Sequence, residues 1–379
     1  MNAERSDRAE SSQPLEWTAD NTHGHGQNPY HVHASLMFPV NAQVMSFWTE
    51  GPLAHGSFEV SQADDEGRAD ALVDVDVWYK VGGAFNPDRA VVNYVRFPGN
   101  KHGLQIVTHH AHFGDEKYVL RFRIRVNLPW AVDNAGAPLV INSLTTQLPQ
   151  FAHHISELSA GTTLKHIALA SDNAAIRVDR AQVDVGTIRT TNASILGCFT
   201  ATRSLALATQ NGAITADVIL LDEGGRSNGG GPSLTMNTAN GEIRSGLTLS
   251  TGSSRALGGT FRIEAHTANA PLDLSFARAP ANSLLNVSAS SANAPARVTV
   301  PSAFEGTFDV QSTWYTPPSV VPGGPVEDPL GRRRRRDVRM DNSRQGVVRG
   351  QIGWDPRDPD AKQGRIGLQT SNAPAVLAL

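Results

Sequence analysis

The sequence is poor in several features that mark common classes of protein. Cys198 is the only cysteine among 379 residues, so no disulfide can form within the chain, as is usual in a reducing compartment. Aromatic residues make up 6%, no long amphipathic helix pattern is present, and no apolar run approaches the roughly 18 residues of a membrane span. The net charge of −3 gives no general attraction to nucleic acid or to an anionic membrane. We therefore expect no transmembrane segment and no nucleic-acid partner.

The amino-terminal stretch also lacks the marks of a secretory signal. Residues 1–28 are polar, carry Glu4, Asp7 and Glu10, and contain no apolar run. We expect this stretch to be a disordered tail, because its composition offers little to bury. Without a recognisable signal peptide, the default expectation for localisation is the cytoplasm.

Glycine and proline are plentiful, with 34 and 22 residues, and they indicate many short strands and turns. We expect residues 29–130 to form an amino-terminal β module. Its predicted strands are His31–Val40, Ser57–Ser61, Ala71–Lys80, Ala90–Phe97, Gly103–His112 and Tyr118–Leu128. Between Leu72 and Trp78, Asp74 and Asp76 alternate with valines, which is typical of a strand with one wet face. The stretch Phe151–Leu158 fits either a strand or a helical turn.

One short pattern recurs through the rest of the chain: Ser or Thr, any residue, Asn, then Ala or Gly. Its asparagines are Asn173, Asn192, Asn211, Asn240, Asn269, Asn293 and Asn372. Chance would produce such a pattern about once or less in a chain of this length. The first two intervals between asparagines are 19 residues, which defines a minimal repeat, and the longer intervals hold Gly-rich insertions.

The residues around each asparagine predict a β-solenoid. Apolar residues stand four and six positions before most of the asparagines and three positions after each of them. Each turn therefore lies between two strands that carry apolar side chains. A repeat of this size cannot bury its apolar face alone, whereas stacked repeats form a continuous core. We expect residues 131–379 to form this solenoid, of the single-stranded β-helix kind. Because side chains alternate between the two faces of a strand, the asparagines are expected on the inward face. There they would form a ladder of hydrogen bonds from one repeat to the next.

A basic segment interrupts the last interval. We expect residues 316–349 to form a mobile loop, because proline and glycine are frequent there. Its consecutive arginines are a possible anion-binding site, namely Arg332, Arg333, Arg334, Arg335 and Arg336. The alternative is a solvated loop, partly neutralised by acidic neighbours such as Asp328 and Asp337.

Several of these motifs resemble a known family. They are Leu128–Pro129, Phe151–His154, the Ser/Thr-x-Asn turns, Asn269–Pro271, Phe304–Phe308 and Asp328–Arg332. Together they resemble the putative-adhesin-like domain of unknown function in its longer, fungal form, over roughly Tyr118 to Leu379. The resemblance implies a β-solenoid-like fold and an association with cell surfaces or adhesion, but it implies no catalytic or binding residue.

Candidate catalytic and metal sites are weak. His110 and His112 share a strand face, as do His31 and His33, yet a zinc site needs three or four ligands and the partners cannot be placed. A glycosidase-type site needs two carboxylates close together, but the acids of the repeat region do not occupy equivalent positions in successive repeats. They are Asp179, Asp184, Asp217, Asp222, Glu223, Glu264 and Asp273. Cys198 has no basic activator beside it and is interpreted as a small packing residue.

The sequence therefore predicts an all-β protein: a β-solenoid with an amino-terminal β module. We expect a non-enzymatic, adhesin-like binding or structural scaffold, with no catalytic residue, no metal and no cofactor. Its partner is not identified by the sequence, and a glycan or a protein surface are the possibilities. The alternative is a carbohydrate-active β-helical enzyme, a polysaccharide lyase or hydrolase.

Overall fold

The structure is a computed structural model that describes residues 9–19, 30–62, 69–79, 90–109, 120–130, 138–158, 161–224, 230–252, 257–324, 326–341 and 346–379. The described residues form 27 strands and no helix. The predicted fold class, an all-β, β-solenoid-like protein, is confirmed. No helix among the residues described has the length and apolar character to span a membrane.

The chain divides into two compact units. The first comprises residues 1–182 and 188–190, and the second comprises residues 183–187 and 191–379. The first unit contains β1 (Ser11–Pro14), β2 (Thr18–Ala19), β3 (Tyr30–Phe38), β4 (Val44–Glu50), β5 (Ala54–Gln62), β6 (Ala71–Tyr79), β7 (Ala90–Phe97), β8 (Lys101–Thr108), β9 (Leu120–Leu128), β10 (Leu139–Gln147), β11 (Phe151–Glu157), β12 (Thr162–Ala170) and the start of β13 (Ile176–Arg189). The boundary expected at residue 130 lies within this unit.

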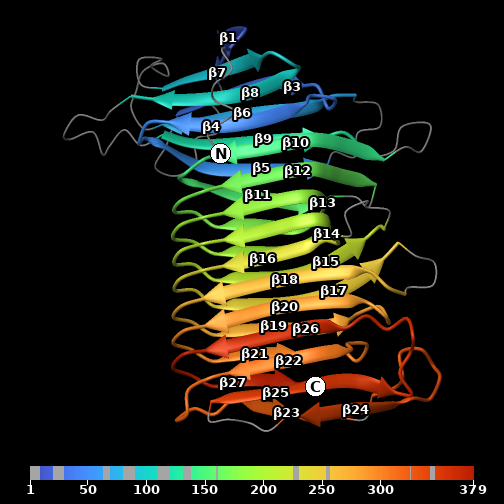
Figure 1. The fold of residues 1–379 in the computed structure, drawn as a ribbon. Coiled ribbons are helices and arrows are strands. Elements are labelled where there is room, and N and C mark those ends of the chain that lie inside the picture. The colour runs from blue at the N-terminus through green and yellow to red at the C-terminus, as the bar shows by residue number, and fades with distance from the viewer. Residues whose placement is uncertain are drawn as a thin grey trace. The chain divides into compact units, whose positions relative to one another are not determined.

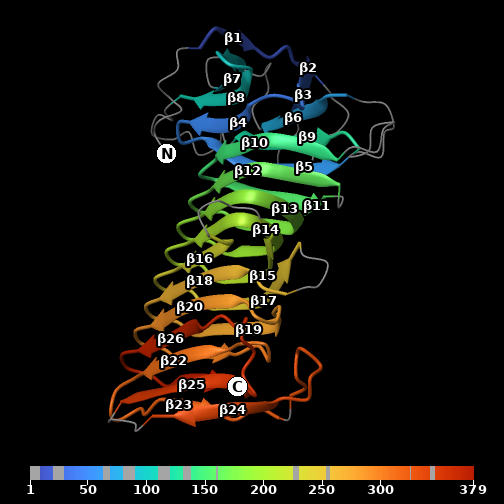
Figure 2. The same cartoon turned by 45° about the vertical axis from the view of Figure 1, so that its right-hand side comes forward.

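Two sheets make up the first unit. One runs in the order β1, β7, β8, β4, β10 and β12, as Figure 2 shows for its last five strands. The other runs in the order β2, β3, β6, β9, β5, β11 and β13. Pairing is antiparallel at the start of each sheet and parallel afterwards. Phe38, Phe47 and Phe58 pack between the sheets, with ring centroids 5.5 and 4.9 Å apart, and all three are buried.

The second unit is built of parallel stacked strands. It contains β14 (Ile195–Ala208), β15 (Ile214–Asp222), β16 (Ser233–Asn237), β17 (Ile243–Thr251), β18 (Thr260–Thr267), β19 (Leu272–Arg278), β20 (Leu284–Ser291), β21 (Ala296–Thr299), β22 (Gly306–Gln311), β23 (Ser319–Val321), β24 (Arg335–Met340), β25 (Val347–Asp355), β26 (Gly364–Thr370) and β27 (Ala375–Ala378). Each asparagine turn joins one strand before it to one after it, so each repeat contributes to two sheets.

The last repeat is placed out of sequence order. Strand β26 pairs with β20 on one side and with β22 on the other, and β27 likewise lies between β21 and β23. Figure 1 shows β26 following β20 in the stack, with β22 beyond it. Beyond β22 the pairing turns antiparallel, first to β25 and then to β24. The strands of residues 300–363 therefore form the end of the stack. The final repeat, which follows them in sequence, lies between them and the preceding repeats.

The asparagines point outward, which corrects the inward direction expected from the sequence. All seven are exposed, while the Ser or Thr two positions earlier is buried in each repeat. The alternation of strand faces holds only in extended backbone, and the residues from the asparagine's predecessor onward form a bend. The alternation of inward and outward side chains therefore ends at the Ser or Thr, which is the polar residue of the turn that points inward.

Other expectations also differ from the structure. The segment expected as a mobile basic loop contains β23 and β24, because its arginines find carboxylate and strand partners. The segment expected as a disordered tail contains β1, which pairs with β7, and β2, which pairs with β3. The ambiguous stretch Phe151–Leu158 is a strand, β11. Strand β4 had no sequence prediction.

Candidate binding site

A hollow in the second unit forms where a glycine separates two acidic side chains. Across the antiparallel pair of β24 and β25, Asp337 lies opposite Gly353. On the other edge of β25, Ile352 pairs with Gly306, which brings Glu305 level with Gly353. The glycine contributes no side chain to this row, so a pocket of about 260 Å³ opens there.

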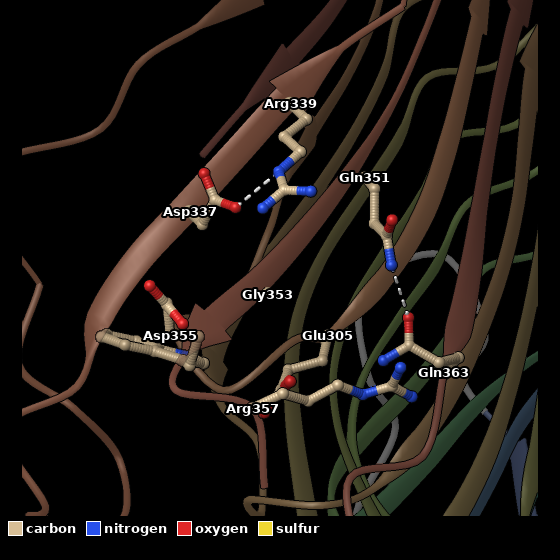
Figure 3. A pocket seen from close by; sticks show the side chains of 9 residues that line it. Glu305, Asp337, Arg339, Gln351, Gly353, Asp355, Arg357 and Gln363 are labelled. Carbon is tan, nitrogen blue, oxygen red and sulfur yellow. Dashed lines mark hydrogen bonds and ion pairs between the residues drawn. The ribbon is translucent and has the colours of Figure 1, made fainter.

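Polar side chains surround this pocket (Figure 3). It is lined by Glu305, Asp337, Arg339, Gln351, Gly353, Trp354, Asp355, Arg357 and Gln363. Three are carboxylates, which accept hydrogen bonds, two are guanidinium groups, which donate, and two are amides, which do both. Within the lining, Arg339 Nε donates to Asp337 Oδ2 at 2.7 Å and Gln351 Nε2 donates to Gln363 Oε1 at 3.2 Å.

Glu305 is the buried acid of the pocket. It is 4% exposed, and its Oε1 accepts a hydrogen bond from Arg334 at 3.4 Å. Its Oε2 has no hydrogen-bond partner in the part of the chain that the structure describes. A buried carboxylate oxygen without a donor is uncommon in folded proteins and calls for a ligand or an ordered water.

An ion-pair network behind the pocket holds Glu305 in place. Arg334 donates to Asp328 at 2.8 Å, and the Asp328 carboxylate also accepts the backbone N–H groups of Leu330, Arg332 and Arg334. These bonds, led by that from the Arg334 side chain, hold the pKa of Asp328 well below its usual range. The Arg334 guanidinium also lies over the ring of Trp354, 5.5 Å from its centroid.

The arginine run does not form one patch. Arg334 is buried in the network above, Arg332 pairs with Asp358 at 2.6 Å, and Arg333 and Arg335 are exposed. Arg336 is half-buried and donates to the carbonyl of Ser302 at 3.2 Å. Burial lowers the pKa of Arg336. Anion binding by this run stays a prediction.

The asparagine side chains form a line of hydrogen bonds along the second unit. Each amide nitrogen donates to the oxygen of the preceding asparagine at 2.6–2.7 Å, namely Asn211 to Asn192, Asn240 to Asn211, Asn269 to Asn240, Asn293 to Asn269 and Asn372 to Asn293. Tyr315 donates its hydroxyl to Asn372 Oδ1 at 3.0 Å and so ends the line. Asn173 belongs to the first unit.

Tyr315 and its neighbour Trp314 form an exposed aromatic pair. Their exposed fractions are 54% and 74%, and the rings meet edge to face with centroids 5.8 Å apart. The turn that carries them is tied to the last repeat, because Ser312 donates to the carbonyl of Ala373 at 2.8 Å and accepts from Thr370 at 2.9 Å. The pair is therefore held in place by the fold.

Two of the histidines singled out in the sequence meet acids in the first unit. Asp76 Oδ1 lies 2.9 Å from His31 Nε2 and 3.1 Å from His33 Nδ1, while its Oδ2 accepts from Arg123 at 3.1 Å. Burial raises the pKa of Asp76, but the hydrogen bonds from His31 and Arg123 outweigh it and lower the pKa overall. Asp76 is thus buried and saturated, instead of facing water as expected.

No metal-binding group of three or more ligands occurs among the residues the structure covers. His110 and His112 lie outside those residues. Acids of the repeats pair locally, since Asp179 bonds His154 and Arg177, and Glu264 bonds Arg262. Cys198 is half-buried.

Sequence reasoning missed the pocket. Glu305 stood inside the motif Phe304–Phe308, which carried the family resemblance but no role. The pocket depends on the pairing register of β22, β24 and β25. Neither the repeat nor any local sequence motif predicts that register. The one usable signal was a strand glycine, Gly353, among polar residues.

No family model and no curated protein matches this chain. Among solved structures, it is similar to a putative cell adhesion protein from Clostridium sporogenes ATCC 15579, with a TM-score of 0.18 and 8% sequence identity. The alignment covers 91% of this chain and 97% of that one. A likeness of this degree does not assign a function.

Proposed function

We propose that this protein is a non-enzymatic, adhesin-like binding scaffold that contacts a glycan through its exposed aromatic pair. The observation that carries the proposal is the exposure of Trp314 and Tyr315 on an anchored turn. Large aromatic side chains in water cost free energy unless a partner covers them, and Trp and Tyr dominate the binding energy of many interfaces.

The anchoring of the aromatic turn favours binding over a fortuitous exposure. Ser312 and Thr316 hydroxyls lie 3.1 Å apart, and those of Thr313 and Thr316 lie 2.7 Å apart, which closes the turn on itself. The Tyr315 hydroxyl is fixed by Asn372, at the end of the line of amides. A surface ordered before binding loses less conformational entropy on association, so it binds more tightly for the same contacts.

A glycan suits the chemistry next to this pair. Sugar rings present an apolar face to an aromatic ring and hydroxyl groups at their edge, and exposed amides such as Asn372 can both donate to and accept from hydroxyls. Contact with Trp314 and Tyr315 requires no acid, base or nucleophile. The proposal is therefore one of binding without turnover.

The test is an array of plant, fungal and bacterial polysaccharides probed with the intact protein. We expect retention on at least one polymer and loss of that retention in Trp314→Ala. Trp130→Ala, which removes the 44% exposed tryptophan of the first unit, is the matched control and should bind normally. Equal retention of all three proteins would overturn the proposal. New reducing ends after incubation with the same polymers would favour an enzyme instead.

A further inference from the structure

We infer that the pocket around Gly353 is a second binding site, for a single neutral polyhydroxylated ring such as one monosaccharide unit. This site is separate from the aromatic pair, and its ligand binding does not depend on the proposed function. Four features of the pocket support the inference: an unpartnered buried oxygen, the open space over the glycine, the balance of donors and acceptors, and the volume.

The unpartnered oxygen is Glu305 Oε2. Glu305 is 96% shielded from solvent by the rest of the protein, given its 4% exposure, and Oε2 receives no hydrogen bond within the described part of the chain. Leaving such an acceptor unpaired costs about 1–3 kcal/mol. The other oxygen of this carboxylate accepts from Arg334, which Asp328 holds in turn, so Oε2 is the oxygen left for a donor from a ligand.

That oxygen borders the open space over Gly353. Apart from atoms of its two chain neighbours, a Cβ atom placed on Gly353 would meet one atom within 4 Å, and that atom is Glu305 Oε2 at 3.9 Å. A side chain at this position therefore has room, and both Gly353 and Glu305 line the pocket. Figure 3 shows Asp337, Asp355 and Glu305 arranged around this glycine.

The mixture of charges in the lining selects against ionic ligands. A cation would be attracted by Glu305, Asp337 and Asp355 but repelled by Arg339 and Arg357, and an anion would meet the reverse. A hydroxyl group donates to a carboxylate and accepts from a guanidinium or an amide. A neutral ring with several hydroxyls satisfies both kinds of lining group at once.

The volume limits the ligand to one ring. At about 260 Å³ the pocket lies just below the range of about 300–1,000 Å³ that holds drug-sized ligands. Binding through a few hydrogen bonds in a pocket of this size gives a Kd on the order of 1 mM. The competing occupant is an ordered water, which also needs several polar partners but would not require the whole pocket.

The test uses a blocking variant and a matched glycine. Gly353→Val fills the pocket from a strand position where Cβ has room, and valine suits a strand. Gly367→Val is the control, because Gly367 lies in β26, which pairs with the edge of β22 opposite β25, and a Cβ there would have the Val287 carbonyl oxygen as its nearest contact, at 3.8 Å. Binding is measured by saturation-transfer difference spectroscopy on the intact protein with free monosaccharides, arginine and gluconate.

We expect at least one monosaccharide to bind the wild type and Gly367→Val alike, and Gly353→Val to weaken its binding at least tenfold. Arginine and gluconate should bind at least tenfold more weakly than the sugar. The inference is overturned if no monosaccharide binds at a concentration 20-fold above the expected Kd of about 1 mM, which is the result for a site that holds only water. It is also overturned if arginine or gluconate binds more tightly than every monosaccharide. Trp314→Ala should leave monosaccharide binding unchanged and Gly353→Val should leave polymer retention unchanged, which separates this site from the proposed function.

Discussion

At the scale of single residues, His153 is a buried base that the fold keeps neutral. Its Nδ1–H donates to the carbonyl of Phe151 at 3.0 Å, so Nε2 accepts from the hydroxyl of Thr146 at 2.8 Å. Thr146 Oγ1 in turn accepts the backbone N–H of Ala170 at 3.1 Å. Burial lowers the pKa of His153 from 6.5 to about 4. A proton on Nε2 would remove the acceptor that the Thr146 hydroxyl donates to.

The shift makes stability depend on pH with a definite sign. Between about pH 6.5 and pH 4 the unfolded chain binds the His153 proton and the folded chain does not, so acid favours unfolding in that window. The full shift corresponds to about 3 kcal/mol. We expect the urea midpoint of the wild type to fall between pH 7 and pH 4.5 by more than that of His153→Gln, which cannot titrate. Equal changes in both proteins would contradict the assignment.

Arg334 is the second residue whose charge state the fold fixes. Its side chain is 3% exposed and faces the carboxylates of Asp328 and Glu305, which are equally buried. Arg334→Met removes the cation and leaves both acids without it, which typically costs about 3–5 kcal/mol. We expect a clear loss of thermal stability, whereas the exposed neighbour Arg335→Met should change the free energy of unfolding by less than about 0.5 kcal/mol. Similar melting temperatures for the two variants would argue against this network.

At the scale of the element, each asparagine turn has an inner and an outer polar residue. In the turn at Asn240, Thr238 is 8% exposed and its hydroxyl accepts from Gly241 N–H and donates to the Gly212 carbonyl, both at 3.1 Å. Asn240 lies outside and bonds Asn211 at 2.7 Å. The buried hydroxyl bridges two repeats where water cannot replace it, while the exposed amide competes with water.

The two positions should therefore differ in their effect on stability. Thr238→Val keeps the shape but leaves a buried N–H and a buried carbonyl without this partner, at a cost of about 1–3 kcal/mol. Asn240→Ala breaks exposed bonds and should cost about 0.5–1 kcal/mol. Chemical denaturation of both variants measures the order. A larger loss for Asn240→Ala would mean that the outer line of amides, and not the inner hydroxyls, aligns the repeats.

The sequence predicts the repeated element well and its corner less well. Isoleucine three positions after Asn211 and leucine four before it are both buried, as their spacing indicates. The inward direction of Asn211 is wrong because period two was extended through a bend. The pocket at Gly353 lay beyond prediction for another reason, since its residues meet through pairing of β22, β25 and β24 across long stretches of chain.

At the scale of the whole molecule, the second unit is closed by an insertion. Strands β26 and β27 lie between β20 and β22 and between β21 and β23, so their N–H and C=O groups are paired on both sides. Removal of residues 364–379 would leave unpaired edges on both faces, which favours association between chains. We expect the truncated protein to elute as aggregates in size-exclusion chromatography. A stable species of unchanged oligomeric state would contradict the role given to this last repeat.

The account of function rests on the exposed aromatic pair, Trp314 and Tyr315, between β22 and β23. Once a polymer is found that retains the protein, its affinity for Trp314→Ala should fall at least tenfold, which equals about 1.4 kcal/mol, because the most exposed large apolar side chain of the described residues is lost. The affinity of Trp130→Ala should match that of the wild type. Equal affinities for Trp314→Ala and the wild type would contradict the account.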